Sequence, residues 1–154
     1  MRKLLFTIIT AVICLNAYIA TADENISDAE KSAHMAHQNY VDAINSNNLD
    51  SLLGMLTEDV VFMSAGDPVM VGKEAVKPWV AGYYEAFHTH WDKTVEEFIV
   101  QGEWAFERYS ASFRDSSLTD GSISTGTSWG LAIYHYDADG KWRIARDAWG
   151  PDTQ

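Results

Sequence analysis

The sequence is poor in two kinds of residue, and each shortage argues against a class of function. Only one cysteine, Cys14, occurs among the 154 residues, so disulfide bonds within the chain and metal sites built from several cysteines are excluded. Lysine and arginine number 11 against 22 aspartates and glutamates, a formal net charge of −11. Nucleic acids and anionic membrane surfaces both bind through basic side chains. The sequence therefore argues against both partners.

Long hydrophobic runs are also scarce, and the clearest one predicts a secretory signal peptide. Arg2 and Lys3 precede an apolar run over residues 4–15, which is shorter than the ~20 residues of a membrane-spanning helix. Small residues at Ala20 and Ala22 then fit a signal-peptidase site. We expect cleavage after residue 22, leaving one domain over residues 23–154 in the periplasm or outside the cell, without stable membrane insertion. That mature chain would hold 9 basic and 22 acidic residues and no cysteine.

Helical spacing of apolar residues predicts three helices in the first half of the domain. Ser27 and Glu30 form a capping box, and Asn48 is the expected N-cap of the second helix. Pro78 lacks a backbone donor, so the third helix is expected to begin late or to kink. The three apolar stripes cover residues 33–44, 49–56 and 76–87.

A period of two predicts strands in the second half of the chain. One short strand is expected earlier, and Asp137–Gly140 has the composition of a hairpin turn. Helices grouped early and strands grouped late are typical of an α+β domain, in which the concave face of the sheet packs on the helices. The predicted strands are Val60–Met63, His90–Val100, Trp104–Phe113, Ser122–Tyr136 and Lys141–Trp149.

The order of four short segments resembles the SnoaL-like and ketosteroid-isomerase-like branch of the nuclear transport factor 2-like superfamily. The segments are Asn39–Asp50, Leu56–Met63, Val71–Val76 and Asp139–Trp149, and the resemblance spans about residues 28–152. It implies a cone-shaped, strongly curved antiparallel or mixed sheet wrapped on three N-terminal helices. It also implies a deep apolar pocket and, as is usual in that superfamily, a homodimer.

The resemblance also assigns the catalytic positions of the isomerases to residues of this chain. Those enzymes use a tyrosine on the first helix and an aspartate on a late strand as an oxyanion hole, with a second aspartate as base. The tyrosine corresponds to Tyr40, the base to Ser64 and the oxyanion acid to Ala132. Two of the three groups are missing, so steroid-type isomerisation is not expected.

Asp147 is the candidate replacement for the missing base. It lies two residues before Trp149, so the two side chains share one face of the last predicted strand. The resemblance places Trp149 in the pocket, where burial would raise the pKa of a neighbouring carboxyl group toward that of a general base. Tyr40 is the expected hydrogen-bond donor. The alternative is a structural Asp147 paired with Arg143, Arg146 or Tyr40.

The remaining pocket candidates come from the apolar stripes and from the resemblance. His37 either contacts a ligand, bonds to Tyr40 or is a satisfied core histidine. Alternation places Trp104 with Phe106 on one side of a strand and Ala105 with Tyr109 on the other, and leaves open which side faces the pocket. The predicted pocket residues are His37, Val60, Phe62, Ser64, Tyr83, Ala132, Tyr134 and Trp149.

Neither a metal nor a cofactor is expected. His88 and His90 would point the same way on a strand but have no third ligand at a suitable spacing. Asp137 and Asp139 lack the twelve-residue pattern of a calcium loop, so a hairpin turn is favoured.

Three functions remain open. The first is binding of a small apolar molecule, neutral or cationic because of the acidic chain, in an aromatic-lined pocket. The second is a cofactor-free isomerase, cyclase or dehydratase with Asp147 as general base and Tyr40 as donor. The third is a non-catalytic dimerisation module.

Overall fold

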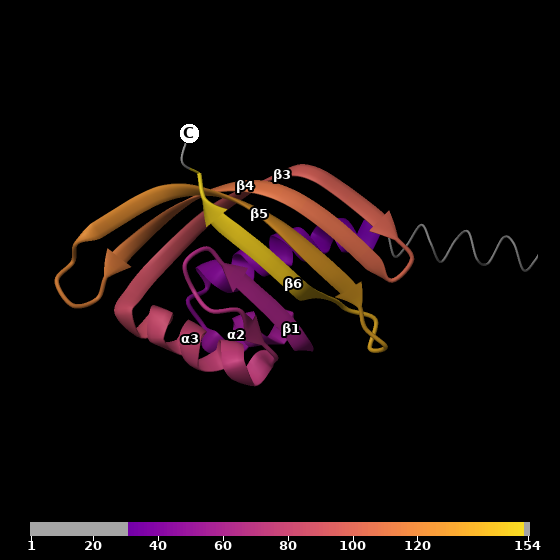
Figure 1. Cartoon of the computed structure of the whole chain (residues 1–154), viewed down its shortest axis with the longest axis horizontal. Helices are drawn as coiled ribbons and strands as arrows, with labels where there is room; N and C mark the ends of the chain where they lie inside the picture. Colours follow the sequence, from indigo (N-terminus) through magenta and orange to yellow (C-terminus); the bar gives the residue numbers. More distant parts are fainter. Residues whose placement is uncertain (1–30, 153–154) are drawn as a thin grey trace, which may run out of the picture.

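Three helices lie under an arched six-stranded sheet in the computed structural model, which describes residues 31–152 (Figure 1). The first helix covers residues 31–45 of the described chain, and two more follow as α2 (Leu49–Gly54) and α3 (Lys73–Ala86). The strands are β1 (Leu56–Ser64), β2 (Met70–Val71), β3 (Phe87–Gln101), β4 (Trp104–Ser117), β5 (Ile123–Tyr136) and β6 (Trp142–Pro151). The predicted signal peptide and the Ser27–Glu30 capping box lie outside the described residues. Within residues 31–152, no helix has the length and apolar character needed to cross a membrane.

The sheet is mixed, and its order places the last strand near the centre. Its strand order is β2-β1-β6-β5-β4-β3; β1 and β6 are parallel, whereas the other pairs are antiparallel. Asp147 on β6 is therefore flanked by Phe62 on β1 and Ala132 on β5, and Ala132 is in turn opposite Glu107 on β4. These four side chains form one row across the inner face of the sheet.

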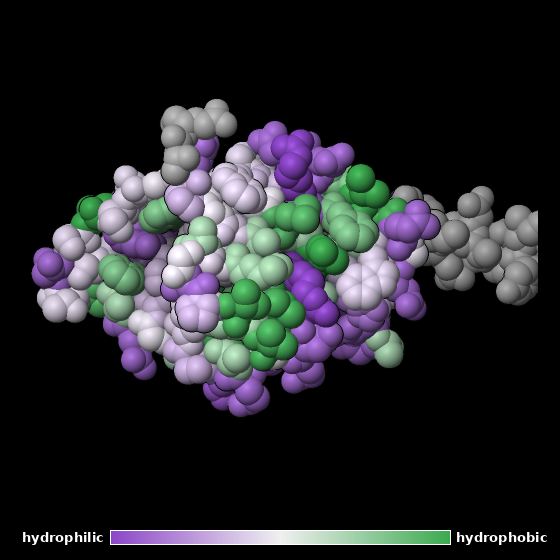
Figure 2. Space-filling view, in the orientation of Figure 1, coloured by the Kyte–Doolittle hydropathy of each residue, from purple (hydrophilic) through white to green (hydrophobic). Residues whose placement is uncertain are grey.

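Burial along β4 shows which face of the sheet is covered by the helices. Ala105, Glu107 and Tyr109 are buried, whereas Trp104 and Phe106 are exposed on the opposite side. The inner face therefore carries the residues of the Ala105–Tyr109 side. In the view of Figure 2, hydrophobic side chains gather in the middle of the visible face, with hydrophilic ones around them.

The predicted α+β architecture is confirmed, and the differences lie at element boundaries. Leu56, predicted in the second helix, begins β1, and Phe87, predicted in the third helix, begins β3. Both are apolar residues at a helix–strand junction, where helical and extended positions can bury the same side chain. For the third helix a late start or a kink was expected, and the late start is wrong, because α3 begins at Lys73 and contains Pro78 in its second turn. Asn48 caps α2 as predicted and accepts a hydrogen bond from the backbone N–H of Ser51 at 2.9 Å.

Candidate functional site

A cavity of about 320 Å³ lies between the inner face of the sheet and the helices. This volume is within the range of small-molecule sites. Most of its wall is aromatic or aliphatic, including Phe62, Trp79, Trp91 and Trp149. A few polar side chains interrupt that wall, and they form two clusters.

The first polar cluster is centred on Asp147, whose side chain is only 3% exposed. The hydroxyl of Tyr40 donates to Oδ2 of Asp147 at 2.9 Å, and the hydroxyl of Tyr109 donates to Oδ1 at 3.0 Å. Burial raises the pKa of Asp147 above its ordinary value, although Lys93 and the two tyrosines act in the opposite direction. The carboxyl group is therefore more basic than a solvated aspartate.

The two tyrosines act as hydrogen-bond donors in this cluster. Burial raises the pKa of both Tyr40 and Tyr109, and the negative charge of Asp147 raises it further. Both phenols therefore stay protonated at neutral pH. Tyr40 comes from the first helix, Tyr109 from β4 and Asp147 from β6, so the cluster joins three separate segments of the chain.

Lys93 on β3 adds an amine to the same cluster. Its Nζ lies 3.6 Å from the ring centroid of Tyr109 and 4.8 Å from that of Tyr40. It is the only lysine or arginine among the described residues that line the cavity. Burial lowers the pKa of Lys93, while the carboxylates of Asp147 and Glu107 oppose that shift.

The second polar cluster is centred on Asp115 of β4, which also lines the cavity. The hydroxyl of Tyr83 and Oγ1 of Thr89 both donate to Oδ1 of Asp115, at 2.7 and 2.5 Å. Burial, together with the neighbouring Asp115, raises the pKa of Tyr83 to about 12, with Thr89 acting against that rise. The cavity wall thus contains two carboxyl groups, and each accepts a hydrogen bond from at least one tyrosine.

A third buried carboxyl group, that of Glu107, lies outside the cavity lining. The hydroxyl of Tyr134 donates to its Oε2 at 2.5 Å, and Nδ1 of His37 lies 2.8 Å from its Oε1. Burial alone would raise the pKa of Glu107, but the hydrogen bonds from His37 and Tyr134 hold it below its ordinary value. His37 is therefore a core histidine satisfied by Glu107, and it lies outside the cavity lining.

The structure divides the predicted pocket residues into two groups. Phe62, Ser64, Tyr83 and Trp149 line the cavity together with Tyr40 and Asp147. The other four are outside its lining, because they pack around Glu107 or within the hydrophobic core. These four are His37, Val60, Ala132 and Tyr134.

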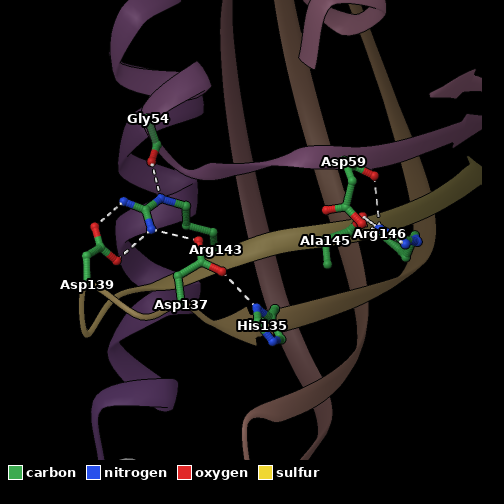
Figure 3. Close-up of polar contacts among 8 residues, drawn as sticks. All are labelled: Gly54, Asp59, His135, Asp137, Asp139, Arg143, Ala145 and Arg146. Atoms are coloured by element: carbon green, nitrogen blue, oxygen red, sulfur yellow. Dashed lines mark hydrogen bonds and ion pairs between the residues drawn. The ribbon is translucent and has the colours of Figure 1, made fainter. Parts of the chain in front are cut away.

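The two arginines proposed as partners of Asp147 are bonded elsewhere (Figure 3). Arg143 bonds to Asp137 and Asp139 at 2.8 and 2.7 Å, and its Nε donates to the carbonyl of Gly54. Arg146 lies 3.3 Å from Asp59. Of the three partners in the structural alternative, only Tyr40 contacts Asp147.

The candidate metal-binding residues are also accounted for. Asp137 and Asp139 flank the hairpin turn between β5 and β6, where Arg143 binds both carboxylates. His88 and His90 are exposed on β3. Within residues 31–152, no group of three or more His, Cys, Asp or Glu side chains is placed to hold a metal ion.

Sequence reasoning missed Lys93, Tyr109 and Asp115 as site residues. Lys93 had one usable signal, since it follows Trp91 by two residues and therefore shares its face of β3. Asp115 lies beyond Phe113, the end of the predicted strand, whereas β4 continues to Ser117. Alternation does not show which face of this strand is covered, so the sequence could not assign Tyr109 to the pocket.

Similarity to known proteins agrees with the fold and the resemblance. A SnoaL-like domain matches residues 37–145. A ketosteroid isomerase-like protein from Erwinia carotovora atroseptica is 21% identical, with a TM-score of 0.73, over 80% of this chain and 96% of that one. An NTF2-like superfamily protein from Salmonella enterica is 12% identical, with a TM-score of 0.69, over 83% and 94%.

A candidate dehydratase of the NTF2-like family from Streptomyces avermitilis has a TM-score of 0.74 at 14% identity, over 84% of this chain and 99% of that one. At these identities the solved structures establish the fold alone. None of the curated proteins matches this chain in sequence. The domain match covers most of the chain, and the curved mixed sheet on three helices is the fold that the resemblance implied. The chain belongs to the SnoaL-like domain family.

Proposed function

We propose that the protein binds a small, largely apolar molecule in the cavity and catalyses a proton transfer on it without a cofactor. One observation carries the proposal: a buried carboxyl group, Asp147, is held by Tyr40 and Tyr109 in the wall of an aromatic cavity. Each carboxylate oxygen has a second lone pair beyond the one used by a tyrosine. Asp147 therefore keeps the capacity to accept a proton from a substrate.

The chemistry that fits this arrangement is an isomerisation, cyclisation or dehydration. Asp147 would accept a proton from a C–H or O–H group of the substrate, and its raised pKa makes it a stronger base than a solvated aspartate. Negative charge that develops on the substrate would be stabilised by the ammonium group of Lys93. The positions of Ser64 and Ala132 carry no acid, so the reaction differs from that of the steroid isomerases.

Two further groups support a ligand with a polar end. Oγ of Ser128 lines the cavity, is buried and has no hydrogen-bond partner within residues 31–152. The second cluster, at Asp115, offers a carboxylate on the same cavity wall. A ligand hydroxyl or amine could bond to either group. Because Asp115 and Asp147 outnumber Lys93 and the whole chain is acidic, we propose a neutral or cationic ligand.

The substitution Asp147→Asn tests the catalytic proposal. A thermal-shift screen of neutral, cationic and anionic aromatic compounds first identifies ligands, and turnover of each ligand is then followed by mass spectrometry. We expect Asp147→Asn to lower turnover by at least about 10²-fold, the usual scale of general-base catalysis, with ligand binding retained. Unchanged turnover in the variant would rule out Asp147 as the base. Tighter binding of anionic than of neutral analogues at low salt would rule out the proposed ligand class.

Binding without catalysis is the second candidate function. Its supporting observation is that each oxygen of Asp147 already accepts a tyrosine hydrogen bond, as expected for a structural carboxylate. Binding without catalysis would be favoured by ligands that stabilise the protein yet are not converted by the wild type or by Asp147→Asn. The open cavity disfavours the third candidate, a module that serves only for dimerisation.

A homodimer and an exported location belong to the proposal as well. The outward face of the sheet exposes large apolar side chains, with Trp129 58% and Leu131 43% exposed. Contiguous apolar surface of this kind marks association sites, so we propose that two copies pair through this face. Light scattering after size-exclusion chromatography tests it: a dimer is expected, and Leu131→Glu should give a monomer. Export would place the mature protein in the periplasm or outside the cell.

A further inference from the structure

The amine of Lys93 lies inside the cavity without the polar partners that a buried lysine usually has. Within residues 31–152, no oxygen accepts a hydrogen bond from its Nζ; the contacts are with the ring faces of Tyr109 and Tyr40. Lys73, by comparison, bonds to Glu58 at 2.7 Å. Release of a proton from Lys93 would therefore break no hydrogen bond to the protein.

Burial shifts this amine toward its uncharged, nucleophilic form, whereas the two tyrosine ring faces favour the charged form. Aromatic side chains replace water around it, and this burial lowers the pKa of Lys93, although Asp147 and Glu107 act in the opposite direction. Desolvation in an apolar pocket is a recognised way to activate a lysine for attack on a carbonyl group. The lysine also points into a space that can hold a substrate.

A proton donor and acceptor lies next to the amine. Nζ of Lys93 sits over the ring of Tyr109, and the hydroxyl of that same ring donates to Asp147. The amine and the carboxyl group thus contact the same tyrosine, one at its ring face and the other at its hydroxyl. Imine formation needs both groups, because the amine attacks the carbonyl carbon and an acid must protonate the departing oxygen.

We propose that Lys93 is a nucleophile that forms an imine with an aldehyde or ketone bearing an apolar, aromatic-sized body. This inference rests on the proposed function, in that the same cavity holds the substrate, and it names the substrate class. Labelling of Lys93 is measured separately from turnover, so the imine and the role of Asp147 as base are tested by different readouts.

The steps balance without any oxidant or cofactor. The lone pair of Nζ adds to the carbonyl carbon, and a proton moves from nitrogen to oxygen to give a carbinolamine. The carboxyl group of Asp147 protonates the hydroxyl, which leaves as water, and a cationic imine and the Asp147 carboxylate remain. That carboxylate can then take a proton from the carbon next to the imine, giving an enamine. Addition of water reverses the sequence and frees Lys93.

Reductive trapping of the full-length protein tests the inference. The protein is incubated at neutral pH with benzaldehyde and sodium cyanoborohydride, which reduces an imine to a stable benzylamine, and the labelling rate of each lysine is measured by peptide mass spectrometry. Lys77, which is exposed on α3, is the internal comparison. We expect Lys93 to be labelled several-fold faster than Lys77, because burial lowers the pKa of Lys93 and so raises its fraction of free amine.

Two controls locate the reaction in the cavity. Benzyl alcohol, which has the same ring but no carbonyl group, should slow labelling at Lys93 and leave Lys77 unchanged. The variant Lys93→Arg keeps the positive charge but removes the primary amine. Its initial labelling rate should therefore fall to the rate measured at Lys77. Labelling of Lys93 at a rate equal to or below that of Lys77, or with no protection by benzyl alcohol, overturns the proposal.

The same experiments separate this inference from the proposed function. Fast labelling of Lys93 combined with full turnover in Asp147→Asn would support the imine and reject Asp147 as the base. Asp147-dependent turnover combined with slow labelling of Lys93 would support the base and reject the imine.

Discussion

The ring of Tyr109 passes directly over Gly130, its neighbour on the adjacent strand. A Cβ atom placed on Gly130 would lie 2.2 Å from Cζ and 2.3 Å from the hydroxyl oxygen of Tyr109. The two residues are register partners on β4 and β5, and the hydroxyl continues to Asp147 on β6. The missing side chain of Gly130 therefore lets one tyrosine cross a whole strand to reach the carboxyl group.

Gly130→Ala is expected to displace Tyr109 and destabilise the protein. The new methyl group would overlap an aromatic ring, and overpacking of a buried site costs about 1–3 kcal/mol. Loss of the hydrogen bond to Asp147 should also weaken ligand binding. Urea unfolding followed by tryptophan fluorescence measures the change. Gly82→Ala is the matched control, since a Cβ there meets nothing within 4 Å and alanine is favoured in the interior of α3. Equal stability of Gly130→Ala and the wild type would contradict the close approach.

Asp147 is expected to make the protein less stable as the pH rises. Its pKa in the folded state is above the unfolded value near 3.8, so the folded state binds more protons between those two values. The free energy of unfolding of the wild type should therefore fall, relative to that of Asp147→Asn, as the pH increases from about 4 through the raised pKa. Urea unfolding of both proteins between pH 4 and 8 measures the difference, and parallel curves would refute the raised pKa.

Removal of the charge at Lys93 is expected to raise the pKa of Asp147 further. Lys93 is the main group that lowers that pKa against the effect of burial, so Lys93→Met should move the titration of the Asp147 carboxyl group to higher pH. Lys93→Arg, which keeps the charge, should leave it close to the wild type. Carbon-13 NMR of the aspartate side chains gives the midpoint directly. A midpoint unchanged in Lys93→Met would show that the two groups do not interact.

Tyr83→Phe and Tyr84→Phe form a matched pair that tests the second carboxyl cluster. Tyr83 donates to the carboxylate of Asp115, whereas Tyr84 donates to the backbone carbonyl of Ile44 at 3.0 Å. Hydrogen bonds to charged groups are the stronger kind. Tyr83→Phe should cost about 1.5 kcal/mol or more of unfolding free energy and Tyr84→Phe about 1 kcal/mol. Thermal or urea unfolding measures both losses, and a larger loss in Tyr84→Phe would argue against a strong hydrogen bond between Tyr83 and Asp115.

The fold could be predicted from the sequence because its signals are local. Apolar spacing marks helices and strands, and the turn at Asp137–Gly140 is encoded by its own residues, with Gly140 at a φ of 77°. The pairing of Tyr40 with Asp147 was within reach only because the resemblance placed both in one pocket. The boundaries at Leu56 and Phe87 were not predicted correctly, because an apolar residue at a helix–strand junction fits both the helical and the strand spacing of apolar residues.

The rest of the site could not be predicted because polar residues in strands are usually assigned to solvent. Lys93, Glu107 and Asp115 all face inward, and each is accommodated by partners that are distant in the sequence. Glu107 in particular is fully buried, and its contacts with His37 and Tyr134 keep those two residues out of the cavity lining. A single sequence contains no signal for such pairings.

The contact between Tyr40 and Asp147 also has a consequence for folding. The two residues are separated by 107 positions along the chain, so their hydrogen bond closes one of the longest loops in the domain. Contacts between residues so far apart in the sequence form slowly, because the entropic cost of closing the loop must be overcome first. In the unfolded chain, Asp147 is a solvated aspartate. Its raised pKa is therefore a property of the folded domain, in which segments far apart in the sequence enclose the carboxyl group.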